Sequence, residues 1–81
     1  MAPHVTLYTR ARCSLCEVAK AVIAGAREQR DFAYEEIDID ADPDLLRLYN
    51  DEVPVIFVDG KKAFKYRVDM KDLLKKLEGR A

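Results

Sequence analysis

The stretch CSLC, residues 13–16, lies between an apolar run, VTLY (residues 5–8), and a helical pattern that continues to about residue 29. It holds the only two cysteines of the chain, Cys13 and Cys16, where the expected first strand leads into the expected first helix. Residues three apart on a helix have Cβ atoms about 5–6 Å apart, and a disulfide joins Cα atoms about 4.4–6.8 Å apart. The spacing therefore predicts a pair that can form a disulfide and open again with little backbone movement.

The start of a helix should make the two cysteines unequal. The first four backbone N–H groups of a helix lack intrahelical partners, and the peptide dipoles leave partial positive charge there. A thiolate on Cys13 can accept these N–H groups, and Arg10 and Arg12 add positive charge nearby. Such settings lower a cysteine pKa from about 8.5 to roughly 3.5–7.5. We therefore expect Cys13 to be the attacking thiolate and Cys16, one turn further along, to resolve the mixed disulfide.

Two registers fit the start of this helix. If Ser14 is the N-cap residue, Ser14 and Glu17 form a capping box and Cys13 lies just outside the helix. If Cys13 is the N-cap residue, its sulfur receives the N–H groups that a cap oxygen would accept. We favour the second register because it explains why a cysteine occupies this position.

A structural disulfide or a zinc site explains the cysteines less well than redox chemistry. A bridge between residues three apart constrains almost no chain, and loop-closure stabilisation grows with loop length. A zinc site needs two further ligands, and the chain has no third cysteine and only one histidine, His4. We therefore predict a redox-active pair and no metal site.

Length and composition restrict the remaining function classes. The 81 residues suffice for one domain, which we expect to span residues 1–81, and 49% hydrophobic residues suffice for one core. The formal net charge is -1, so we expect neither nucleic acid nor an acidic membrane surface as a partner. No apolar run approaches the roughly 20 residues of a membrane span, and the first residues do not resemble a signal peptide. We expect a monomer in the cytosol, the compartment that suits a reducible cysteine pair.

The central part of the chain predicts a second strand and a second helix. Residues 32–39 mix acidic and apolar side chains, which suits an edge strand. Asp42 followed by Pro43 is typical of a helix start, and Asn50 is expected to end this short helix in the left-handed conformation. The first helix is expected to bury Leu15, Val18, Ala19, Val22, Ile23 and Ala26.

The C-terminal part predicts a hairpin followed by a helix. Residues 53–58 and 61–66 are two strand patterns on either side of an Asp-Gly turn, which indicates antiparallel pairing. Asp69 is expected to cap the last helix. The order β-α-β-α-β-β-α predicts an α/β fold, in which a right-handed parallel β-α-β unit joins an antiparallel hairpin and helices cover both faces.

Over nearly its whole length the chain resembles the glutaredoxin branch of the thioredoxin superfamily. The motifs that carry this resemblance are Cys13 with Cys16, Arg10 three residues before them, Val53-Pro54, and the Val-Asp-Gly turn at 58–60. The resemblance implies a thioredoxin-like fold with a four-stranded mixed sheet. It also implies that Pro54 follows a cis peptide bond beside the disulfide, and that Val53 offers backbone groups to the cysteine part of a thiol substrate.

The segment before the last helix departs from this family. Typical glutaredoxins carry a glycine pair before the final acidic residue, where the backbone approaches the γ-glutamyl group of glutathione. Here that region reads Tyr66, Arg67, Val68, Asp69, and the proline that usually follows the first cysteine is Ser14. We expect Arg67 and Asp69 to contact the polar ends of a substrate, and Tyr66 with Arg67 to reshape the glutathione pocket.

The resemblance implies a cytosolic thiol–disulfide oxidoreductase that acts on disulfide-containing proteins or on glutathione. We expect no tightly bound cofactor. Either glutathione or a thioredoxin reductase would act as the electron source. A different class, an iron–sulfur or metal carrier that uses Cys13 from two subunits, is disfavoured because Cys16 is present, since cluster-carrying relatives usually replace that cysteine. A non-catalytic binding module is disfavoured by the intact cysteine pair.

Overall fold

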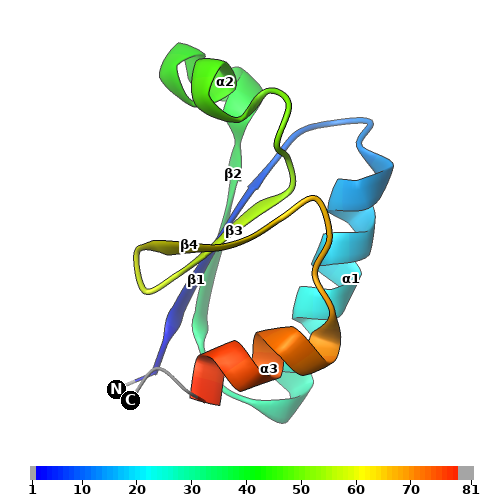
Figure 1. Cartoon of the computed structure of the whole chain (residues 1–81), viewed down its shortest axis with the longest axis vertical. Helices are drawn as coiled ribbons and strands as arrows, with labels where there is room; N and C mark the ends of the chain where they lie inside the picture. The colour runs from blue at the N-terminus through cyan, green and yellow to red at the C-terminus, as the bar shows by residue number, and fades with distance from the viewer. Residues whose placement is uncertain (1, 79–81) are drawn as a thin grey trace.

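The computed structural model describes residues 2–78 and contains four strands and three α-helices (Figure 1). A short 3-10 helix, which the sequence did not predict, precedes the second α-helix. In chain order the elements are β1 (His4–Thr9), α1 (Ser14–Gln29), β2 (Ala33–Asp38), η1 (Ile39–Ala41), α2 (Pro43–Tyr49), β3 (Val55–Val58), β4 (Lys61–Lys65) and α3 (Met70–Glu78). The predicted order β-α-β-α-β-β-α is confirmed.

The four strands form one mixed sheet in the order β2-β1-β3-β4. β1 pairs with β2 in parallel and with β3 in antiparallel fashion, so Tyr8 lies between Ile37 and Val55. β3 and β4 form the predicted hairpin, and its turn residues Asp59 and Gly60 have φ angles of 52° and 83°. Two positive φ values are typical of the tight turn that matches the twist of paired strands. The acidic strand β2 lies at one edge of the sheet, as predicted, and β4 lies at the other.

Helices α1 and α3 pack against one face of the sheet, where they enclose the main core. Successive strand residues point to opposite faces, so alternate residues of β1 and β3 reach this core. The buried core residues on these four elements are Val5, Leu7, Ala19, Ile23, Ala26, Ile56, Val58, Leu73 and Leu77. On the opposite face, the ring of Tyr49 from α2 stacks on Tyr8 at 4.9 Å and meets Phe57 edge-on. Helices therefore contact both faces, as predicted.

Helices α1 and α3 pack closely at a glycine. A Cβ atom at Gly25 would lie only 2.5 Å from the terminal methyl carbon of Met70, the first residue of α3. Contacts this short do not occur between real atoms, so the end of the Met70 side chain occupies the space that a side chain at position 25 would take.

Two predictions about helix residues are wrong. Val18 was expected in the core, yet 58% of it is exposed, because the face of α1 turned to the sheet follows Cys16, Ala19 and Ile23 instead. Asn50 was expected to be left-handed, but its φ of -48° and ψ of -41° are right-handed. The helical turn continues past Asn50, since the N–H groups of Glu52 and Val53 donate to the Tyr49 carbonyl oxygen. The predicted start of α2 at Asp42 and Pro43 is confirmed.

Candidate active site

Cys13 and Cys16 are joined by a disulfide at the start of α1, with their Cα atoms 5.2 Å apart. Cys13 is the N-cap residue, in an extended conformation, and its Sγ accepts a hydrogen bond from the Cys16 backbone N–H at 3.1 Å. A cap oxygen would normally accept such an N–H group. The favoured register is therefore confirmed, and Ser14 is the first helical residue instead of the cap.

The two sulfurs differ in exposure. Cys16 is completely buried beneath the first turn of α1, whereas Cys13 is half-buried. A partner disulfide approaching from solvent therefore reaches Cys13 first. The geometry supplies the asymmetry that a division between an attacking and a resolving thiol requires.

The two arginines near the cysteines have different surroundings. The Arg10 guanidinium donates to Asp40 Oδ1 at 2.9 Å and to Asn50 Oδ1 at 2.6 Å. These contacts tie the loop before Cys13 to η1 and to the end of α2. Arg12 is exposed, has a left-handed φ of 57°, and forms no side-chain hydrogen bond or ion pair with any of residues 2–78.

Val53 and Pro54 lie at the same end of the sheet as the cysteines, because Tyr8 near the end of β1 pairs with Val55 at the start of antiparallel β3. The peptide bond between them is cis, as the resemblance implied, and Pro54 is buried. The Val53 N–H donates to the Tyr49 carbonyl oxygen at 3.2 Å. The Val53 carbonyl oxygen accepts no hydrogen bond from the part of the chain described. Val53 thus keeps one backbone acceptor for a ligand.

The segment from Tyr66 to Asp69 forms one wall of a groove of about 430 Å³ beside the start of α1. In Figure 1 this loop between β4 and α3 runs alongside the first turns of α1. The groove is lined by Leu15, Val18, Ala19, Phe64, Tyr66, Arg67, Val68, Asp69 and Asp72. Arg67 and Asp69, which the sequence predicts to contact a substrate, thus line a groove next to the turn that carries the cysteines. Arg10 instead contacts Asp40 and Asn50.

Two residues of this loop have specific conformations. Tyr66 has a left-handed φ of 68°, and its N–H donates to the Pro54 carbonyl oxygen at 2.9 Å, which joins the loop to the proline segment. Asp69 caps α3, as predicted: its side chain accepts the Lys71 N–H and its carbonyl oxygen accepts the Leu73 N–H. The Asp69 carboxylate is therefore already engaged with the helix that it begins.

Sequence reasoning missed the apolar part of the groove. The sequence predicts Leu15 and Val18 in the core and Phe64 in a strand, and it assigns none of them to a groove. A signal for Val18 existed, because it lies off the stripe formed by Cys16, Ala19 and Ile23 on a regular helix. An apolar side chain off that stripe, one turn after the cysteines, is a candidate for contact with a substrate.

Comparisons with known proteins agree with this geometry. The family description "Glutaredoxin-like domain (DUF836)" matches residues 4–78. The chain belongs to the glutaredoxin-like family. A relative from Dictyostelium discoideum, the "Glutaredoxin-like protein YDR286C homolog", is 37% identical over 81 residues, which cover 93% of this chain and 75% of the relative.

Solved structures give the same result for the fold of this glutaredoxin-like chain. The solution structure of protein Ne2328 from Nitrosomonas europaea is 33% identical, with a TM-score of 0.81 over 95% of this chain and 93% of that one. A mutant thioredoxin from Halobacterium salinarum is 26% identical, with a TM-score of 0.68 over 94% of this chain and 72% of that one. The predicted thioredoxin-like fold is confirmed.

Within residues 2–78, no three His, Cys, Asp or Glu side chains gather closely enough to hold a metal ion. In the same range, no helix is long and apolar enough to cross a membrane.

Proposed function

We propose that this glutaredoxin-like protein is a thiol–disulfide oxidoreductase that reduces disulfides through Cys13 and Cys16. The observation that carries the proposal is the unequal pair at the start of α1. Cys13 is accessible and its sulfur accepts a helix N-terminal N–H group, whereas Cys16 is buried one turn further along. A thiolate at such a position is stabilised by the hydrogen bond and by the helix dipole, and the thiolate is the nucleophile in disulfide exchange.

The proposed reaction proceeds in two exchanges. The thiolate of reduced Cys13 attacks one sulfur of the substrate disulfide, so that a bond from Cys13 Sγ forms, the substrate S–S bond breaks, and the other substrate sulfur leaves and takes up a proton. Cys16 then loses its proton and attacks Cys13 Sγ, which releases the second substrate thiol. The substrate gains two electrons and two protons, and the protein is left with the Cys13–Cys16 disulfide.

Return to the dithiol form requires two electrons from an external thiol. Two molecules of glutathione can supply them as they form glutathione disulfide, or a thioredoxin reductase can supply them from NADPH. The groove beside α1 supports contact with a thiol ligand, because Arg67 is exposed there and the Val53 carbonyl oxygen has no partner among residues 2–78. We place this reaction in the cytosol, where such reductants keep thiols reduced.

A coupled assay tests the proposal. The oxidised protein is mixed with hydroxyethyl disulfide, NADPH and either glutathione with glutathione reductase or thioredoxin reductase alone, and NADPH consumption is followed. We expect turnover with at least one system and its complete loss in Cys13→Ser. A protein that remains inactive with both systems, while its cysteines are shown to cycle between dithiol and disulfide, would contradict the proposal.

A second variant tests the order of the two exchanges. Cys16→Ser should form a mixed disulfide through Cys13 that persists on a non-reducing gel, because the resolving thiol is absent. Ser14→Ala serves as the control, since it alters the same turn without touching either sulfur. If Cys13→Ser traps substrate and Cys16→Ser does not, the roles are reversed.

A further inference from the structure

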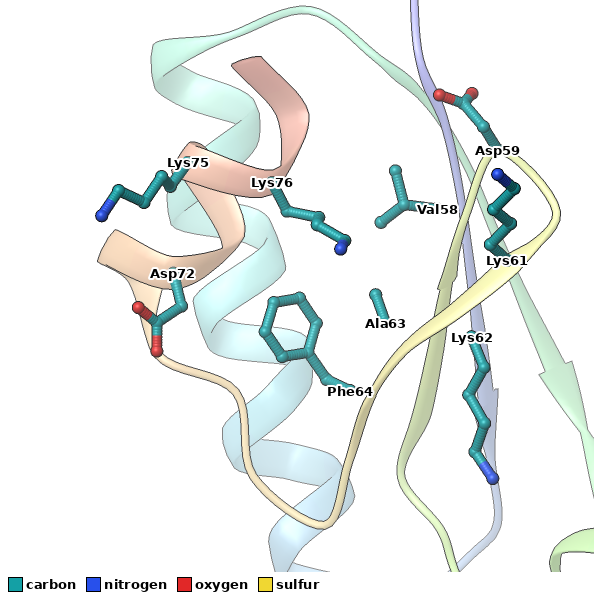
Figure 2. Close-up of a pocket in the computed structure, with 9 residues that line it drawn as sticks. All are labelled: Val58, Asp59, Lys61, Lys62, Ala63, Phe64, Asp72, Lys75 and Lys76. Carbon is teal, nitrogen blue, oxygen red and sulfur yellow. The ribbon is translucent and has the colours of Figure 1, made fainter. Parts of the chain in front are cut away.

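A second groove, of about 630 Å³, lies between the β3–β4 hairpin and α3 (Figure 2). Its apolar floor consists of Val58, Ala63 and Phe64. Its charged lining residues are Asp59, Lys61, Lys62, Asp72, Lys75 and Lys76. In Figure 2 the Lys76 side chain reaches over the floor toward Ala63 and Val58, while Lys62 and Lys75 point away from it. We refer to this site as the lysine groove.

The lysine groove adjoins the groove beside the cysteines, because Phe64 and Asp72 line both of them. The two grooves together, which we call the channel, extend from Leu15, which lies between Cys13 and Cys16 in the sequence, to the tip of the hairpin. Lys61, at the start of β4, lies five residues from Tyr66, just after its end, which is about 17 Å at ~3.3 Å per residue. An extended chain bound at Cys13 that passes Tyr66 would therefore reach Lys61 at least five residues from its own cysteine.

Three lysines of this groove are available to a partner. Lys61, Lys75 and Lys76 form no ion pair with any of residues 2–78, whereas Lys62 pairs with Glu52. Of the two acidic side chains, Asp59 already accepts the His4 N–H at 3.0 Å, and Asp72 lies where the two grooves meet. The hairpin end of the channel is thus rimmed by unpaired positive charge above an apolar floor.

Acidic and basic residues are also separated across the whole molecule, and the basic ones lie on the side of the lysine groove. The segment of residues 33–52, which contains β2 and α2, has eight acidic residues and one basic residue. The segment of residues 59–78, which contains β4 and α3, has seven basic residues and four acidic ones. Because β2 and β4 are opposite edges of the sheet, the net charge of -1 conceals an acidic edge and a basic edge. An acidic partner is therefore attracted to the β4 edge and repelled from the β2 edge.

We propose that the lysine groove binds an acidic segment of a protein whose disulfide is reduced at Cys13. The inference rests on the proposed function and adds the substrate class. An apolar side chain of the segment packs on Phe64 and Ala63. Carboxylates at least five residues from the reacting cysteine form ion pairs with Lys61 and Lys76. A protein segment is the occupant because the channel is long, open and apolar at its floor, whereas glutathione reaches only the part beside the cysteines.

A binding experiment tests the groove without turnover. Three fluorescent peptides carry serine in place of the cysteine and a leucine four residues away on either side. They differ only in the residues that begin about five positions from the serine (the minimum reach at ~3.3 Å per residue), which are glutamate, serine or lysine. By fluorescence anisotropy, we expect the glutamate peptide to bind about tenfold more tightly than the serine peptide at low salt, and the lysine peptide more weakly still. The preference should shrink in 0.5 M salt, where the Debye length is only about 4 Å.

A matched pair of variants tests whether the preference for the glutamate peptide arises in the lysine groove. Lys76→Glu should abolish the preference for the glutamate peptide, whereas Arg47→Glu makes the same change in charge on α2, away from the groove, and should preserve it. A glutamate peptide without the leucines should bind less tightly than the complete one. Equal binding of the glutamate and serine peptides, equal losses in the two variants, or no effect of the leucines would each overturn the proposal.

A turnover experiment separates this inference from the proposed function. Cysteine forms of the same peptides, as mixed disulfides with 2-mercaptoethanol, are compared with hydroxyethyl disulfide. We expect a higher kcat/KM for the glutamate peptide in the wild-type protein, no such preference in Lys76→Glu, and unchanged reduction of hydroxyethyl disulfide in both proteins. If hydroxyethyl disulfide is reduced without any peptide preference, the docking site is wrong. If nothing is reduced, the proposed function is wrong, and the binding experiment still tests whether the lysine groove binds an acidic segment.

Discussion

The backbone N–H of Cys16 donates to the sulfur of Cys13 across 3.1 Å, so the N-terminus of α1 is directed at one sulfur of the pair. In the reduced protein this arrangement should favour a thiolate on Cys13, while the buried Cys16 remains a thiol. A fall of one unit in a thiol pKa raises its thiolate fraction by up to about tenfold at neutral pH. We expect iodoacetamide at about pH 6–7, where only a thiol of lowered pKa is ionised, to label Cys13 well before Cys16. Equal rates, measured by mass spectrometry of tryptic peptides, would contradict the division of roles.

In the loop that follows β4, the residue type at position 66 should affect the stability of the fold. Tyr66 is left-handed, a conformation that costs roughly 1–2 kcal/mol for residues with a Cβ atom and little for glycine. We therefore expect Tyr66→Gly to be more stable than Tyr66→Ala by about 1 kcal/mol in urea unfolding. Both variants lose the same ring, so their difference isolates the backbone. If Tyr66→Ala were the more stable of the two, the loop would have changed its conformation.

The same loop should control access of glutathione. The side chains of Tyr66 and Arg67 line the groove beside the cysteines, where a glutathione backbone would have to lie close to the chain. We expect Tyr66→Gly combined with Arg67→Gly to raise the rate of the glutathione-coupled assay. Lys71→Ala serves as the control, because Lys71 is exposed on the neighbouring helix α3 and lines neither groove. A lower rate in the double variant would identify Tyr66 and Arg67 as glutathione ligands.

Thr9, at the end of β1, carries a cost in stability. Its Oγ1 is buried and finds no hydrogen-bond partner in the described part of the chain. Thr9→Val keeps the shape and removes the unsatisfied hydroxyl, so we expect unfolding to require about 1 kcal/mol more. Thr6→Val is the matched control on the same strand, because the Thr6 hydroxyl does have a partner, His4 Nδ1 at 3.4 Å. A gain in Thr6→Val as large as that in Thr9→Val would show that β-propensity, and not the unsatisfied hydroxyl, is responsible.

The ion pair between Glu52 and Lys62 should make stability depend on pH. The hydrogen bond from Lys62 lowers the pKa of Glu52 below its ordinary value in the folded protein. A carboxylate with a lowered folded-state pKa stabilises the fold above its unfolded pKa, and this contribution is lost as the pH falls through the folded pKa. The difference in unfolding free energy between wild type and Glu52→Gln should therefore be larger at pH 7 than at about pH 3. In a Lys62→Met background, Glu52→Gln should have the same effect on unfolding free energy at both pH values. An effect that still grows between about pH 3 and pH 7 in that background would contradict the role of the Lys62 hydrogen bond.

Local sequence patterns predicted most of the fold because their signals were strong at short range. The Asp-Gly turn, the pair Asp42 and Pro43, and the apolar spacing of α3 each define an element within a few residues. The two helix predictions that failed depend on contacts beyond the helix itself. Val18 faces a loop from the far end of the chain, and Asn50 lies in a turn whose hydrogen bonds lead on to Val53.

The candidate site was predictable in its chemistry and less so in its surroundings. The spacing of Cys13 and Cys16 was enough to predict the pair and its N-cap register. The contacts of Arg10 could not be predicted, because its partners Asp40 and Asn50 are brought near only by the pairing of β1 with β2 and β3. The basic edge was concealed for a similar reason. A net charge summed over the chain does not show which residues share an edge of the sheet.

The close approach of Gly25 to Met70 also concerns the shape of the channel. Helix α1 carries the cysteines, α3 follows the loop at Asp69, and the channel beside the sulfurs lies between these two elements. Met70 can accommodate a methyl group at position 25 by rotating its flexible side chain, and we expect a larger residue there to displace the start of α3. Gly25 itself lines neither groove. We therefore expect natural variation or protein engineering at position 25 to widen the channel and alter selectivity while every residue that touches a substrate stays the same.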